Sequence, residues 1–241
     1  MRAKTLTWAV LAALLLGVGG GTGWWFIVGQ SQAATADSTG TDNEEAQTES
    51  VFVGDDLETL LLPATETLAI ASLQGDATDT SIMLNCETSE LCLGSGGARC
   101  EELNIARSTA YPEPAAARLR SISSGTTVQV RHFATQLANS ETVESQLSEL
   151  KSAAESCVAN SGAELIELAE QGVTVYAGKA PGKTFAELDG NGDAGWLLVA
   201  RGNTLSSVLV SSDLLTNDNN LMAIAELALA TAVSAAPTAS S

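Results

Sequence analysis

The sequence predicts an α+β domain in which helices pack on an antiparallel sheet with a cleft, stapled by disulfides and preceded by one N-terminal transmembrane helix. Three observations support this class. Two strand-like runs flank Gly125, a long amphipathic helix follows them, and a second strand pair around Gly202 leads into a closing helix. Strands and helices that follow one another in runs, without regular alternation, are typical of α+β domains.

The chain begins with a basic head, residues 1–4, and no charged residue follows Lys4 until Asp37. The apolar part, Leu6–Val28, would measure roughly 35 Å as a helix, against a hydrocarbon core of about 30 Å. Residues 5–29 are therefore predicted to be a transmembrane signal-anchor. Ser31–Ala33 resembles a cleavage site, so a removable signal peptide followed by secretion stays open as the alternative.

Charge on either side of this segment predicts its orientation. Arg2 and Lys4 precede it, and no Lys or Arg occurs again before Arg99. The positive-inside rule then gives a single-pass protein of the cell membrane with a cytoplasmic N-terminus and an extracytoplasmic C-terminal domain. Residues 30–50 are predicted to be a disordered acidic linker, residues 51–235 the folded domain, and residues 236–241 a disordered tail.

Composition limits the partners. The 241 residues include 29 acidic and 11 basic ones, which gives a formal net charge of −18. Nucleic acids and anionic lipid surfaces both require clustered Lys and Arg, so the charge argues against either partner. The 45% of apolar residues is enough to form the core of one domain.

The folded part is expected to open with two short helices. Asp55–Leu62 is typical of a capped helix stopped by Pro63, and Thr65–Leu73 of a second helix that ends before Gly75. A polar loop then leads to the short apolar run Ser81–Leu84.

The centre of the domain is predicted to be a hairpin covered by a helix. Arg118–Ser124 and Thr126–Ala134 are the two strands. The helix that follows has one apolar stripe at a period of 3.6 residues, formed by Val143, Leu147, Leu150, Ala154 and Cys157.

The last third is predicted to contain three strands and a helix. Val173–Ala177 is one strand, and Gly195–Ala200 with Thr204–Ser211 forms a hairpin. The closing helix spans about 217–235, with an inward face formed by Leu221, Ile224, Ala228 and Ala232.

Four cysteines outside the membrane are expected to form two disulfides, because that compartment is oxidising. Three connectivities exist, and we favour Cys100–Cys157, which would join the helix to the chain entering the hairpin, with Cys86–Cys92 as a short clip. No cysteine pair has the spacing of a zinc knuckle, so no metal is predicted.

Motifs for catalysis are incomplete. Asp189–Asp193 begins like a calcium loop, but Ala194 and Ala200 stand where glycine and glutamate are required. Ala177–Thr184 resembles a phosphate loop with a misplaced first glycine. Ser148 and Lys151 lie within a helix without their companion motifs. His132, the one histidine, lacks a nucleophile turn and is expected to face solvent or line a cleft. We predict neither enzyme activity nor a cofactor.

The ordered features resemble a known family. They are Asp56–Leu62, Cys100 followed by Tyr111–Pro112, Val128–Phe133, a helix ending at Cys157, and Trp196–Asn203 before a final helix. This order is similar to the PknH-type extracellular sensor domain of actinobacteria. The resemblance implies an antiparallel α+β domain with a broad cleft and two disulfides, which binds or senses a ligand.

The chain departs from that family in two ways. No kinase domain precedes the predicted anchor, and the second cysteine pair precedes Cys100 where the family has it later. The resulting hypothesis is a non-catalytic, membrane-anchored module of the cell envelope that binds a small envelope molecule or a protein. A structural or chaperone-like interaction protein is the alternative, and a hydrolase a weaker one. Pockets combine aromatic walls with polar groups, so the candidate cleft residues are Tyr111, Arg131, His132 and Trp196.

Overall fold

A computed structural model describes residues 51–84, 115–161, 164–180 and 193–237, all within one compact unit, Thr48–Ser241. The predicted head, anchor and linker, and the residues Cys86, Cys92, Cys100 and Tyr111, lie outside the described residues, as does the side chain of Cys157. Among the helices that are described, none has the length and apolar character needed to span a bilayer.

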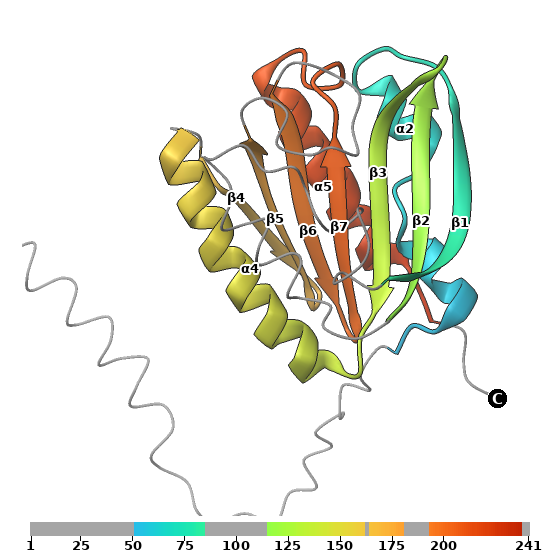
Figure 1. Cartoon of the computed structure of the whole chain (residues 1–241), viewed down its shortest axis with the longest axis vertical. Helices are drawn as coiled ribbons and strands as arrows, with labels where there is room; N and C mark the ends of the chain where they lie inside the picture. The colour runs from blue at the N-terminus through green and yellow to red at the C-terminus, as the bar shows by residue number, and fades with distance from the viewer. Residues whose placement is uncertain (1–50, 85–114, 162–163, 181–192, 238–241) are drawn as a thin grey trace, which may run out of the picture. The chain divides into compact units, whose positions relative to one another are not determined.

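One seven-stranded antiparallel sheet forms the centre of the domain (Figure 1). Its spatial order is β1-β2-β3-β7-β6-β5-β4, so the central hairpin and the last third of the domain meet where β3 pairs with β7. The strands are β1 (Asp76–Leu84), β2 (Ala115–Ser124), β3 (Thr127–Gln136), β4 (Ile166–Glu170), β5 (Val173–Ala180), β6 (Ala194–Arg201) and β7 (Thr204–Val210).

Helices cover both faces of the sheet. On one face α5 (Asp218–Ser234) packs on β4, β5 and β6, while the 3-10 helix η2 (Gly54–Leu60) packs on β2 and β3. Figure 1 shows α5 behind the sheet. On the other face α4 (Ser140–Ser161) packs on β5, β6 and β7. The short helix α2 (Ala64–Ala69) contacts β1 at the edge.

The core has two layers because successive strand residues point to opposite faces. Leu197 and Val208 belong to the layer beneath α5 and η2, and Trp196 and Leu209 to the layer beneath α4. Strands β6 and β7 are therefore buried on both faces, and β7 buries Thr204, Ser206 and Ser207 along with its apolar residues.

Most of the predicted elements are confirmed. The structure contains the hairpin of β2 and β3, the pair β6 and β7, and both long helices. The inward stripe of α5 is buried at every predicted position, and Val143, Leu150 and Ala154 of α4 are buried too. An apolar stripe is a local signal, which explains why these predictions hold.

Two predictions need correction, and one strand was missed. The polar loop before Ser81 is part of β1, which begins at Asp76 and lies at the exposed edge of the sheet. Strand β4 was not predicted, since it also lies at an edge and buries little. The first helix is a 3-10 helix whose N-cap, Val53, makes no side-chain capping bond. Asp55 lies within the first turn of this helix, and its carboxylate binds Arg118.

Candidate functional site

The predicted cleft residues do not converge on one face of the sheet. Arg131 on β3 and Trp196 on β6 both pair in register with Leu209 of β7, so they share the face beneath α4. Trp196 is 2% exposed, and its indole nitrogen has no hydrogen-bond partner among the described residues. Arg131 is half-buried and donates to the hydroxyl of Ser121 at 3.1 Å.

His132 lies on the opposite face and is buried, with 1% of its surface exposed, instead of facing solvent. Its Nδ1 accepts a hydrogen bond from the backbone N–H of Leu62 at 3.0 Å. Burial, together with the positive charge of Arg120, lowers the pKa of His132 to about 3. The ring is therefore a neutral acceptor that holds the segment after η2 against the sheet.

Arg120 forms the centre of a polar network beside this histidine. Its Nε and Nη2 donate to the two carboxylate oxygens of Asp79 on β1, at 2.7 and 2.6 Å. Its Nη1 donates to the backbone carbonyls of Leu61 and Leu62, both at 3.2 Å. The hydrogen bond from Arg120 lowers the pKa of Asp79, so this carboxylate stays charged.

Arg118 extends the network along β2. It binds the carboxylate of Asp55 and the hydroxyl of Ser81, and its Nη1 lies 3.5 Å from the carboxylate of Glu58. The two arginines thus tie η2, β1 and β2 together. This arrangement positions the chain that leads into α2.

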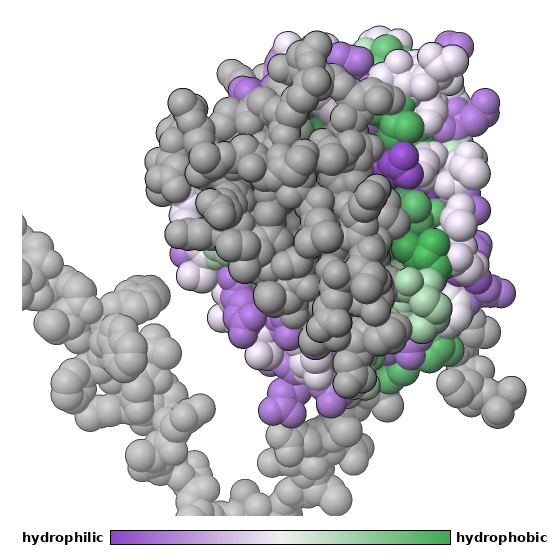
Figure 2. Space-filling model, viewed as in Figure 1, coloured by the Kyte–Doolittle hydropathy of each residue, from purple (hydrophilic) through white to green (hydrophobic). Residues whose placement is uncertain are grey.

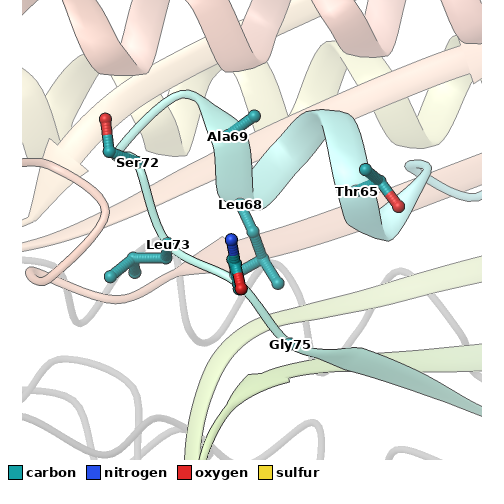
Figure 3. A pocket seen from close by; sticks show the side chains of 7 residues that line it. Thr65, Leu68, Ala69, Ser72, Leu73 and Gly75 are labelled. Atoms are coloured by element: carbon teal, nitrogen blue, oxygen red, sulfur yellow. The ribbon is translucent and has the colours of Figure 1, made fainter.

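A pocket of about 500 Å³ lies beside α2. Figure 3 shows that one continuous segment, α2 and the turn after it, supplies the wall. Leu68 is buried at its base, whereas Thr65, Ser72 and Gln74 are exposed at its rim. Among the residues that the structure describes, the lining includes no charged side chain and is formed by Thr65, Leu68, Ala69, Ser72, Leu73, Gln74 and Gly75.

Backbone contacts fix the shape of this pocket. Ser72 has a φ of 58°, and the N–H of Leu73 then bonds the carbonyl of Leu68 at 2.9 Å, which closes the turn after α2. The hydroxyl of Ser124 donates to the carbonyl of Gln74 at 2.9 Å. A Cβ on Gly75 would lie 1.8 Å from the carbonyl oxygen of Ser123, so only glycine allows this approach.

A second polar cluster joins α4 to the sheet. The ammonium group of Lys151 lies 3.1 Å from the carboxylate of Glu167 and 4.9 Å from the ring centre of Tyr176. The Tyr176 hydroxyl donates to Glu167 at 3.4 Å. The bond to Glu167 raises the pKa of Lys151, so the amine is held charged and is a poor nucleophile.

Within the described ranges no group of three His, Cys, Asp or Glu side chains is placed to hold a metal ion. Scans against protein-family models, curated proteins and solved structures found no match to this chain. Sequence reasoning missed the α2 pocket because its residues are chemically ordinary. The one local signal is Gly75, which in the sequence pattern marks only the end of a helix.

Proposed function

We propose that the protein is a non-catalytic, membrane-anchored extracytoplasmic binding module, and that the α2 pocket holds a small uncharged molecule. The observation that carries this proposal is the uncharged lining of the pocket in a chain with a net charge of −18. Ligand pockets of about 300–1,000 Å³ commonly combine an apolar base with a few polar groups at the rim.

The lining indicates the chemistry of the ligand. Leu68 and Leu73 offer aliphatic contact, while the hydroxyls of Thr65 and Ser72 and the amide of Gln74 can donate and accept hydrogen bonds. A molecule with one aliphatic side and several hydroxyl or amide groups fits this combination. An ionised ligand would leave its charge without a counter-charge in the lining, which is unfavourable.

The test is native mass spectrometry of the full chain, exported to an oxidising compartment and released from detergent micelles. Wild type is compared with Ala69→Trp, which fills the pocket with an indole, and with Ala230→Trp. Ala230 is exposed on α5 and does not line the pocket, so its variant is a matched control. We expect an adduct on wild type and on Ala230→Trp that is lost from Ala69→Trp. An adduct retained by Ala69→Trp would contradict the proposal.

The location and the family relation are part of the same proposal. The uncharged segment 5–29 and the basic residues before it support an anchor, and the antiparallel sheet with packed helices is what the PknH-type resemblance implies. A peptide map prepared without reduction tests both points. Recovery of a peptide beginning at Met1 would show that the anchor is retained, and absence of a Cys100–Cys157 cross-link would count against the family relation.

A further inference from the structure

Strand β1 is a long, exposed edge of the sheet. It has nine residues, pairs with β2 on one side, and stands at the end of the strand order, so no described residue pairs with its other side. Its side chains are exposed apart from half-buried Ile82 and from Leu84, whose burial is not described; Met83 is 66% exposed. Such an edge presents backbone N–H and C=O groups that can pair with another strand.

We propose that β1 pairs antiparallel with β1 of a second copy of this chain, about a two-fold axis at Thr80. This register places Thr80 opposite Thr80, Asp79 opposite Ser81, and Asp76 opposite Leu84. Directly opposed residues in an antiparallel pair share a face, and Asp79 and Ser81 both lie on the face that carries Arg118 and Arg120. The two sheets would then continue into one.

The positions of the charged residues favour this register over the one centred on Asp79, although within one chain Asp79 already pairs with Arg120 and Arg118 with Asp55 and Glu58. Arg118 hydrogen-bonds to Ser81 in its own chain, so Asp79 of the second copy, facing Ser81, would lie close to the guanidinium of Arg118. The contact repeats on the other side of the two-fold axis. An axis at Asp79 would instead place two aspartates directly opposite each other, which is destabilising.

The edge itself favours a weak and reversible dimer. Figure 2 shows mostly neutral and hydrophilic residues along the margin over β1, so little apolar surface would be buried. The net charge of −18 on each copy also opposes association. We expect a dimer that forms at micromolar or higher concentration. This inference does not depend on the α2 pocket, whose lining residues precede β1 in the sequence.

The test uses two opposite substitutions at the two-fold axis, Thr80→Glu and Thr80→Lys, in the full chain. The Thr80 side chain is exposed, so both substitutions should leave the fold intact. Sedimentation in density-matched detergent measures the dimer dissociation constant. Each variant alone places like charges on directly opposed residues, whose Cβ atoms would lie about 5 Å apart, and should weaken the dimer by up to about fivefold. A mixture of the two variants should restore association, because Glu then faces Lys.

Thr78→Glu is the matched control, because it adds the same charge to the same strand but opposes Ile82 of the second copy. It should weaken the dimer much less than Thr80→Glu. Three results would overturn the proposal: a wild-type chain that stays monomeric up to about 100 μM, a dimer that Thr80→Glu leaves intact, or a mixture of the two variants that does not associate. Ala69→Trp should leave the dimer unchanged. Failure of the pocket proposal can therefore be distinguished from failure of the dimer proposal.

Discussion

The backbone N–H of Leu62 donates to Nδ1 of His132 at 3.0 Å, across 70 positions of the chain. This bond joins the segment after η2 to the centre of the sheet. It requires an unprotonated Nδ1, and Arg120, whose charge faces the same ring, opposes protonation further. The stability of the domain should therefore depend on pH.

The first prediction concerns acid. The pKa of His132 is about 3 in the folded protein, below an ordinary value of 6.5, so the unfolded chain binds a proton first as the pH falls. The contribution of His132 is complete above pH 6.5 and is lost progressively down to about pH 3. Between pH 6.5 and pH 5 the free energy of unfolding should fall by roughly 2 kcal/mol on this account.

Urea unfolding at both pH values measures this effect, with His132→Asn as the control. The asparagine retains an acceptor for Leu62 but does not titrate. A variant that loses as much stability between pH 6.5 and pH 5 as wild type would show that other groups cause the dependence.

The second prediction concerns Asn203, which binds both backbone groups of Phe52. Its Oδ1 accepts from the Phe52 N–H at 2.8 Å, and its Nδ2 donates to the Phe52 carbonyl at 3.1 Å. Asn203→Ala leaves both groups unpaired in a buried place, so unfolding free energy should fall by about 2–4 kcal/mol. Asn219→Ala, at an exposed helix position, should change it by less than about 0.5 kcal/mol. Equal losses in the two variants would contradict this account.

The third prediction separates two reasons for glycine. Gly75→Ala brings a Cβ against the carbonyl of Ser123, whereas Gly125→Ala meets nothing within 4 Å but must adopt a φ of 60°. We expect Gly75→Ala to cost at least about 2 kcal/mol, through displacement of the chain from β2, and Gly125→Ala about 1 kcal/mol. Thermal unfolding ranks the two. If Gly125→Ala were the more damaging, the close approach at Gly75 would not be a tight constraint.

The fourth prediction concerns the planar guanidinium of Arg120. It contacts both oxygens of Asp79 and, through a separate nitrogen, the carbonyls of Leu61 and Leu62. A lysine ammonium cannot reach all of these groups, so Arg120→Lys should lower the free energy of unfolding by about 1–3 kcal/mol. A double-mutant cycle with Asp79→Asn checks the mechanism. The two losses should not add, and simple additivity would mean that the pair is not coupled.

The long elements were predictable because their signals are local. The stripe of α4 and the alternation of β2 and β3 depend only on which residues are apolar and on how they are spaced. Strand β1 was predicted only in part because an edge strand need not bury either face, so Asp76–Thr80 has the composition of a loop. Its pairing with β2 supplies its backbone hydrogen bonds, and no local sequence pattern indicates this pairing.

The candidate site was much less predictable. His132 alternates with Val130 and Ala134 on one face of β3, and the sequence does not say whether anything covers that face. Helix η2 covers it, which converts a candidate ligand contact into a buried structural acceptor. The α2 pocket depends on a six-residue helix, a turn at Ser72 and one close approach at Gly75, none of which has a distinctive pattern.

The sequence by itself determined the antiparallel α+β class, the central hairpin and the inward faces of the two long helices, because hydrophobic burial follows the period of each element. Only the tertiary structure decided the strand order that joins β3 to β7, the faces on which Arg131, His132 and Trp196 lie, and the position of the α2 pocket. These features depend on contacts between residues far apart in the chain. Such contacts are set by packing of whole elements, which a local pattern does not encode.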